Sequence, residues 1–183
     1  SLYQVLPKAL SSRSWIPPSI SWIKCNLAYS WDKKTKLVGV AWLLRNHCGK
    51  VLLHSRHAIS DIDSLTEAKL QCLLWAINIM SELKISQVVF STEAYELIIG
   101  AVIRAKACPS FAFQASEINL ALSKIRKWKL HVKTAATNLS AYLIAQSASF
   151  GPRIHSYMAS GAPFWLRNTL DNDMAFESLF SSF

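Results

Sequence analysis

The spacing of the hydrophobic residues in this 183-residue chain changes near residue 64, and that change constrains the fold more than any other feature. Before it, apolar segments suited to strands are separated by short charged or polar turns. They occupy residues 22–31, 37–44 and 51–57. Such short connections predict an antiparallel meander, because antiparallel neighbours can be joined by a tight turn.

Beyond the change, residues 65–83 are apolar on nearly every side of a helix, which predicts a central, buried helix. Ser64 and Glu67 stand at the positions of a capping box at its start. The chain therefore passes from a meander of strands to a buried helix.

The remaining elements alternate between helix and strand. We expect strands at 87–91 and 126–133, and helices at 93–106, 111–126 and 137–149. The order β-β-β-α-β-α-α-β-α predicts an α/β fold. Its sheet would be mixed and five-stranded, with the antiparallel three-strand meander plus crossover strands, and helices would flank it.

The length suits one domain with terminal extensions. Residues 1–21 hold three prolines and no clear period, so we expect an N-terminal arm. Residues 22–150 would form the domain. Residues 151–183 would form a C-terminal tail that packs on the domain or on a partner.

The charge composition points toward a partner. A net charge of +9 favours an anionic one such as RNA or DNA. Charged residues make up only 17% of the chain and hydrophobic residues 51%. That balance suits a surface hidden against a protein partner, and it suits equally a well-packed core rich in tryptophan.

Four scattered cysteines, without a C-x-x-C pair, argue against a zinc site or a disulfide framework. They are Cys25, Cys48, Cys72 and Cys108. Their use as small buried hydrophobes predicts a reducing, intracellular compartment, with nucleus, mitochondrion and plastid left open. No apolar run reaches the roughly 18 residues that span a bilayer, so no membrane partner is expected. The sequence contains no Gly-rich phosphate loop and no histidines at metal-like spacing. We therefore expect no small-molecule substrate.

Short motifs occur in a fixed order along the chain. They are Trp15-Ile-Pro-Pro18, Ile23-Lys-Cys-Asn26, Ser30-Trp-Asp32, Val38-Gly-Val-Ala-Trp42, Thr66-Glu-Ala68, Val88-Val-Phe-Ser-Thr-Glu93, the segment 138–145 and Pro163-Phe-Trp-Leu166 with Asp173. In order and spacing the set resembles the ribonuclease H-like domains descended from plant retroelements, often called reverse-transcriptase-like domains. The resemblance implies a ribonuclease H-like fold.

Active members of that family hydrolyse the RNA strand of an RNA–DNA hybrid with two divalent ions, which need about four converging carboxylates. The resemblance places those carboxylates at Ala28, Glu67, Glu93 and Tyr142. Two of the four are therefore not acids. The family's substrate-gripping arginine falls on Ala135, and Tyr29 stands where the family has a small residue.

The two remaining acids have simpler readings. Glu67 suits a capping box, and Glu93 is a favourable charge at a helix N-terminus. We favour these roles, so no catalytic residue is expected to function and no cofactor is expected. If activity remains, Glu67 and Glu93 would hold Mg²⁺.

These residues predict a catalytically inactive module that binds nucleic acid or serves as a scaffold subunit of a larger intracellular assembly. The candidate nucleic-acid contacts are Lys124, Arg126, Lys127, Lys129, Lys133, Lys33 and Lys34. Equally, the basic stretch suits a solvated edge that discourages aggregation. The apolar tail at 164–183 favours protein subunits as partners. The alternative function is an active or weakly active RNA–DNA hybrid ribonuclease.

Overall fold

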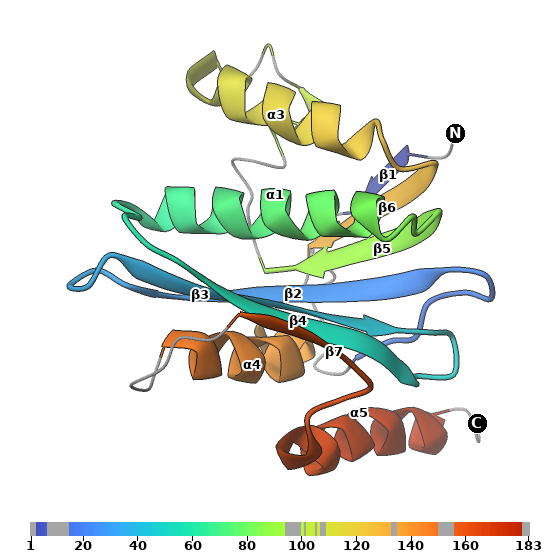
Figure 1. Ribbon diagram of the computed structural model, residues 1–183. Helices are drawn as coiled ribbons and strands as arrows, with labels where there is room; N and C mark the ends of the chain where they lie inside the picture. Colours follow the sequence, from blue (N-terminus) through green and yellow to red (C-terminus); the bar gives the residue numbers. More distant parts are fainter. Residues whose placement is uncertain are drawn as a thin grey trace.

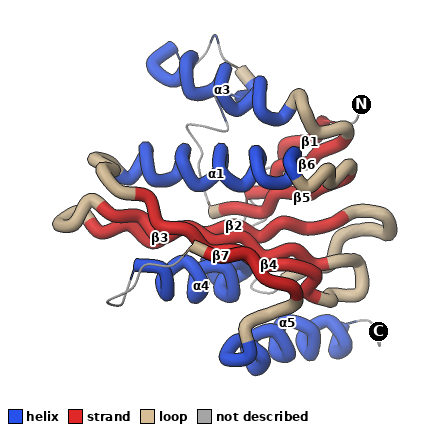
Figure 2. Tube along the Cα trace, viewed as in Figure 1, coloured by secondary structure: helices blue, strands red, loops and turns tan. Residues whose placement is uncertain are grey.

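The computed structural model describes residues 3–6, 15–93, 100, 102–104, 106, 109–132, 135–149 and 156–180, with the backbone alone for 3–6, 135–136 and 175–180. Within them, one mixed sheet lies between helical layers (Figures 1 and 2). Its strands are β1 (Tyr3–Leu6), β2 (Ile23–Asp32), β3 (Leu37–Arg45), β4 (Val51–Ile59), β5 (Gln87–Thr92), β6 (Lys127–Val132) and β7 (Tyr157–Ser160). The helices are α1 (Leu65–Glu82), α3 (Ala112–Leu122), α4 (Leu139–Ser149) and α5 (Arg167–Phe180), with 3₁₀ turns η2 (Pro109–Phe111), η3 (Ala135–Asn138) and η4 (Phe164–Leu166).

The sheet order is β1-β6-β5-β2-β3-β4-β7. The pairs β2–β3, β3–β4 and β4–β7 are antiparallel, and the first two of them confirm the predicted meander. The strands β5 and β6 join β2 in parallel, as crossover strands. The prediction of a mixed α/β sheet flanked by helices is confirmed.

The predicted number of strands was wrong, because the described sheet has seven strands instead of five. The extra ones are β1, from the N-terminal arm, and β7, from the C-terminal tail. Each has four residues, too few for an alternating pattern to identify it. Backbone pairing with β6 and β4 defines them instead.

The helix expected over 111–126 ends earlier, with α3 stopping at Leu122. The next residues turn back toward the sheet, and Ile125 is buried in that turn. The helix expected over 93–106 lies largely outside the described residues.

One face of the sheet carries α1, and α3 packs on the outer side of α1 (Figure 1). The larger core lies here, and α1 contributes seven buried side chains to it. The N-cap prediction is confirmed, because the Glu67 backbone N–H donates to Ser64 Oγ at 3.1 Å. Cys25 and Cys72 are buried in this core, whereas Cys48 is exposed.

The opposite face carries α4, which packs on β2, β3 and β4. Gly39 on β3 permits this close approach, since a Cβ there would lie 2.2 Å from the Ala145 carbonyl oxygen. The helix α5 lies beyond α4 (Figure 1). Arg45, 1% exposed, ties α5 to the sheet through a 2.8 Å ion pair with Asp173.

Among the described residues, no helix combines the length and the apolar character that crossing a bilayer requires.

Candidate functional site

A buried network of amide side chains anchors the start of α4 to the sheet. Asn26 on β2 accepts a hydrogen bond from Trp15 Nε1 at 2.9 Å and donates to Asn138 Oδ1 at 2.6 Å. Asn138 in turn donates to the carbonyls of Ser91 at 3.1 Å and Leu27 at 3.4 Å. The amide of Asn138 therefore joins β2, β5 and α4 at one point.

Three of the four carboxylate positions predicted from the resemblance follow residues of this network closely along the chain. Ala28 follows Asn26 by two residues on β2, and Glu93 follows Ser91 by two residues after β5. Tyr142 lies one helical turn after Asn138 on α4. On α1, Cys72 contacts the Ala28 carbonyl oxygen at 3.3 Å, which brings the helix of Glu67 to the same part of β2.

At the first position, Ala28 belongs to a small apolar cluster beneath α4. Its exposed fraction is 6%, and the cluster includes Ala141, Ile144 and Ala145 of α4. A methyl group has no oxygen for Mg²⁺, and the apolar surroundings would disfavour an ionised carboxylate at this place.

At the second position, Glu67 serves as a helix cap. Its carboxylate accepts a hydrogen bond from the Asp63 backbone N–H at 3.2 Å, while its own N–H is bonded to Ser64. It also lines a groove between α1 and α3 that includes Phe113 and Glu117.

At the third position, Glu93 is engaged by Tyr29, whose phenol hydrogen-bonds to its carboxylate. Burial, together with the charge of Glu93 and this hydrogen bond, raises the pKa of Tyr29 to about 12. The tyrosine is partly buried and stands beside Ala28 on β2. The phenol therefore bonds to one of the two carboxylates that remain at the four positions.

At the fourth position, Tyr142 is 39% exposed on α4. A neutral phenol is a poor ligand for Mg²⁺. The side chain of Ala135, the predicted replacement of the gripping arginine, lies outside the described side chains.

The donor set therefore does not fit a two-ion centre. Of the four positions only Glu67 and Glu93 carry carboxylates, and each already has a hydrogen-bond partner. No group of three or more His, Cys, Asp or Glu side chains suited to a metal occurs among the described residues.

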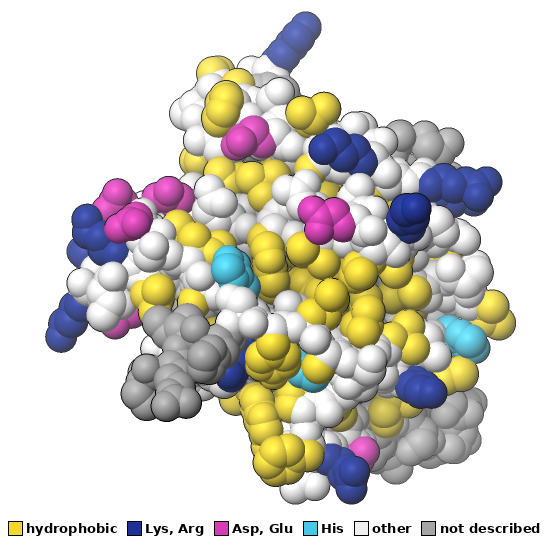
Figure 3. Space-filling view, viewed as in Figure 1, with side chains coloured by type: hydrophobic (Ala, Val, Ile, Leu, Met, Phe, Trp, Pro, Cys, Tyr) yellow, Lys and Arg dark blue, Asp and Glu magenta, His cyan; other side chains and the backbone are white. Residues whose placement is uncertain are grey.

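The predicted basic contacts fall into two separate groups. Lys124 and Arg126 are exposed in the turn before β6, and Lys127 and Lys129 lie on its outer face. Trp128 is buried on the other face, as predicted. Lys and Arg side chains gather around this turn at the right of Figure 3.

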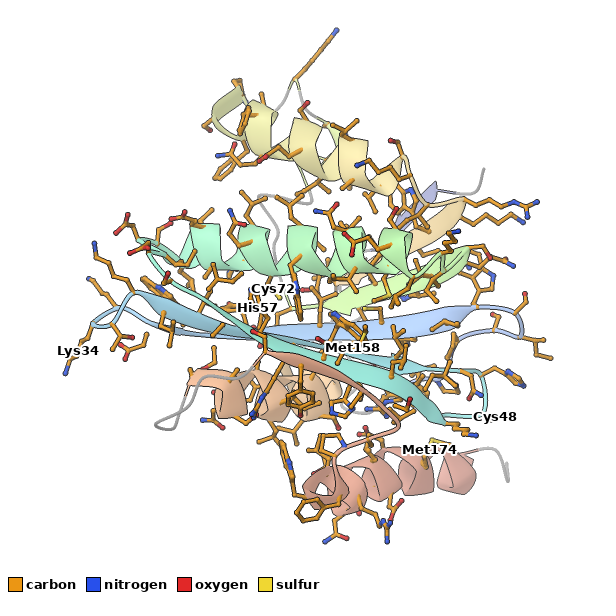
Figure 4. The ribbon with its side chains drawn as sticks, in the orientation of Figure 1. Lys34, Cys48, His57, Cys72, Met158 and Met174 are labelled. Carbon is orange, nitrogen blue, oxygen red and sulfur yellow. The ribbon has the colours of Figure 1, made fainter. Side chains whose placement is uncertain are left out.

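The second group, Lys33 and Lys34, lies at the far end of the sheet. These residues follow the last residue of β2, whereas the first residues of β2 lie level with β6 across the parallel strands. Figure 4 shows Lys34 at the left tip of the molecule. Ten residues of strand put about 30 Å between the groups. They do not form one surface, and Lys133 lies outside the described residues.

Sequence reasoning missed the anchoring roles of Asn26 and Asn138, and the basic residues Lys24 and His131 that lie close by. A signal for Lys24 was present, because it alternates with Asn26 and Ala28 and so shares their face of β2. Its 4% exposed fraction could not be read from the sequence.

Comparisons with known proteins agree with this architecture. The family model described as reverse transcriptase-like matches residues 26–148. An RNase H1 from the halophilic archaeon Halobacterium salinarum superposes with a TM-score of 0.59 at 16% identity, over 70% of this chain and 97% of that one. The N-terminal RNase H domain of a Mycobacterium tuberculosis protein gives 0.57 at 15% identity, over 69% and 92%. No curated protein sequence matches significantly. The ribonuclease H-like fold expected from the sequence is confirmed.

Proposed function

This chain belongs to the reverse transcriptase-like family, and from that premise we propose that it is a nucleic-acid-binding module without nuclease activity. The observation that carries the proposal is the position of Ala28, which is a buried methyl group where the resemblance expects the first metal ligand. The engagement of Glu93 by Tyr29 supports the same conclusion. Loss of acids also removes charges that repel phosphate, which favours binding over cleavage.

The surface proposed to bind is the basic end of the sheet, formed by Lys124, Arg126, Lys127 and Lys129. Neutralising phosphates with these side chains releases counterions, so affinity depends on salt. Three or four such contacts to a single strand give a slope of log K against log salt of roughly −2 to −3.

Binding is tested by fluorescence anisotropy with a labelled single-stranded RNA and an RNA–DNA hybrid at several KCl concentrations. The double substitution Lys124→Glu with Arg126→Glu is expected to lower affinity at least tenfold. Lys33→Glu with Lys34→Glu changes charge equally at the opposite end and is expected to lower it less than threefold. Salt-independent binding, or equal losses in both variants, would refute the proposal.

Inactivity is tested by incubating the hybrid with the protein and Mg²⁺ or Mn²⁺, beside Glu67→Ala. No cleavage of the RNA strand is expected. Cleavage by the unaltered protein that Glu67→Ala abolishes would establish the alternative function, a hybrid ribonuclease.

A second candidate function is a scaffold subunit that binds another protein. Apolar side chains form a broad patch between α1 and β4 in Figure 3, and Met158 of the edge strand β7 is 53% exposed. Phe164 and Trp165 are exposed in the adjoining tail at 87% and 45%. Native mass spectrometry of the assembly from its source, compared with Met158→Lys, tests this function. A protein that stays monomeric and without a partner would count against it.

A further inference from the structure

A groove with a volume of about 430 Å³ lies between the first halves of α1 and α3. Its lining includes the carboxylates of Glu67 and Glu117 and the side-chain amide of Gln114. No lysine, arginine or histidine is among its described lining residues, although the chain as a whole has a net charge of +9. The groove is therefore a local acidic surface on a basic protein.

Gln114 shows which ligand atoms the groove lacks. Its amide oxygen is buried and has no hydrogen-bond partner among the described residues. A buried acceptor without a donor is destabilising, and an N–H group that enters the groove would remove this cost. Because the carboxylates of Glu67 and Glu117 lie beside it, the donor that fits best is an ammonium or a guanidinium group.

Exposed apolar side chains flank the acidic groove on α3. Phe113, which lines the groove, is 72% exposed, and Leu120 is 66% exposed. Phe113, Glu117 and Leu120 are spaced by four and three residues, so they lie on one side of the helix. Large exposed hydrophobic side chains that gather in this way mark a contact surface, and the face of an aromatic ring attracts a cation. The groove therefore suits a partner whose basic side chains have apolar stems.

The same chain carries a surface of this kind in the turn after α3. Lys124 and Arg126 are exposed on either side of Ile125, which is 3% exposed. The backbone N–H of Lys124 donates to the Ala121 carbonyl at 3.3 Å, and that of Ile125 donates to the Leu122 carbonyl at 3.0 Å. The turn is thus held by its backbone, and the aliphatic stems of its two basic side chains are available to pack on apolar surface.

The groove and the turn do not meet within one molecule. The groove lies between the first halves of α1 and α3, whereas the turn follows the last residue of α3 (Figure 1). Among the described side chains, those of Lys124 and Arg126 form no ion pair with Glu67 or Glu117. The two matching surfaces are therefore free to meet between molecules.

We propose that the turn of one copy of this chain docks in the groove of a second copy. Lys124 and Arg126 donate to the two carboxylates and to the Gln114 amide oxygen, and their stems pack on Phe113. Because the two surfaces are different patches of the molecule, the contact is head-to-tail and leaves one groove and one turn free at the ends. The assembly therefore grows as an open chain with protein concentration.

This inference goes beyond the proposed function and does not depend on it. The turn also belongs to the surface proposed to bind nucleic acid, so one turn cannot hold RNA and a second copy together. Two copies with a net charge of +9 repel each other at long range. Docking is therefore best measured near 0.1 M salt, where charges are screened beyond about 10 Å and close pairs still attract.

Sedimentation velocity of the full chain over a fiftyfold range of concentration tests the proposal. The average sedimentation coefficient of the unaltered protein is expected to rise with concentration. Glu117→Lys in the groove, and Lys124→Glu with Arg126→Glu in the turn, should each raise the dissociation constant at least tenfold. Matched controls make the same changes of charge elsewhere. They are Glu82→Lys at the exposed end of α1, and Lys33→Glu with Lys34→Glu, and both should associate as the unaltered protein does.

Mixing the two altered proteins gives the sharpest result. Glu117→Lys keeps an intact turn, and Lys124→Glu with Arg126→Glu keeps an intact groove, so a mixture should form one-to-one dimers and nothing larger. Phe113→Ala, a change at an exposed side chain that the fold tolerates, should weaken association of the otherwise unaltered protein about threefold or more. Melting temperatures of all variants check that each one is folded.

Several outcomes would overturn the proposal. They are an unaltered protein that stays monomeric, groove and turn variants that associate as the controls do, and a mixture that stays monomeric. A labelled arginine-rich peptide that binds the monomeric protein, and loses affinity in Glu117→Lys, would assign the groove to a different protein and overturn the second copy as its occupant. In anisotropy with labelled RNA, Glu117→Lys should keep its affinity within about threefold, which separates self-association from nucleic-acid binding.

Discussion

Asn26 and Ala28 lie two residues apart on the same face of β2, and the two places differ in what surrounds them. Asn26 is buried among hydrogen-bond partners from the N-terminal segment and from the start of α4. Ala28 is buried among methyl groups of α4. The first place anchors the helix through polar contacts, and the second closes the space beneath it with apolar ones.

The difference shows that α4 is held against the sheet through uncharged polar contacts. Asn26, Asn138 and Trp15 fix the helix without any carboxylate. Arg45 extends the anchoring outward, because its guanidinium lies 4.5 Å from the centre of the Trp15 ring and pairs with Asp173 of α5. We call Trp15, Asn26, Arg45, Asn138 and Asp173 the anchoring network.

The largest expected effect is on the buried ion pair of this network. Asp173→Ala leaves the 1%-exposed Arg45 with an uncompensated charge, so we expect the free energy of unfolding to fall by about 3–5 kcal/mol in urea titrations. Burial lowers the pKa of Arg45 and raises the pKa of Asp173, although the charge of each residue favours the ionised form of the other.

Because burial outweighs attraction for both groups, the pair itself adds little net stability. The double substitution Arg45→Met with Asp173→Leu is therefore expected to lose less than Asp173→Ala alone. A loss below about 1 kcal/mol for Asp173→Ala would mean that the ion pair is not part of the anchoring.

The next prediction compares Asn138, a residue of the anchoring network, with Tyr142 at a carboxylate position. Asn138→Ala leaves the buried carbonyls of Leu27 and Ser91 without their side-chain donor, so we expect a loss of about 3 kcal/mol in urea titrations. Tyr142→Asp, one turn later and 39% exposed, is expected to change stability by less than about 0.5 kcal/mol. Equal losses of stability in the two variants would contradict the difference between the two positions.

A smaller effect is expected when the missing acid is put back. Ala28→Asp places a carboxylate in an apolar cluster, so we expect a loss of about 2 kcal/mol, against less than 1 kcal/mol for the neutral Ala28→Ser. Thermal melts with and without Mg²⁺ should then coincide. A rise in the melting temperature of Ala28→Asp on adding Mg²⁺ would show that the carboxylates still converge on an ion.

The smallest effect concerns Tyr29. A phenol whose pKa is about 12 in the folded protein and about 10 when unfolded favours the neutral form on folding. The contribution of the neutral phenol to the free energy of unfolding is present below pH 10 and is lost between pH 10 and pH 12. Ultraviolet titration should show one late tyrosine, absent in Tyr29→Phe, which should also cost about 1 kcal/mol.

Glu93→Gln tests the cause of this shift. Removing the charge should lower the pKa of Tyr29 and leave it above 10, because burial is the larger cause. An unchanged pKa of Tyr29 in Glu93→Gln would mean that the Glu93 carboxylate does not interact with the phenol.

The sequence predicted those elements whose own residues carry a pattern. The buried helix α1, its Ser64 cap and the alternating strand β6 follow from local spacing and were confirmed. The strands β1 and β7 could not be predicted, because pairing with residues more than 90 positions away defines them. The nonacidic residues at two carboxylate positions were visible in the sequence. The amide contacts of Asn138, which join segments far apart in the chain, were not.

The position of β1 at the edge of the sheet has a consequence for synthesis. This strand is synthesised before the other strands that the structure describes, and it pairs with β6, about 120 residues later. At about 5–20 residues per second, β1 waits roughly 6–24 s on the ribosome before its partner exists. In that interval β2, β3 and β4 can pair among themselves, because their connections are local. A nascent chain stalled before residue 127 should therefore leave β1 accessible to a protease, and one released after residue 149 should protect it.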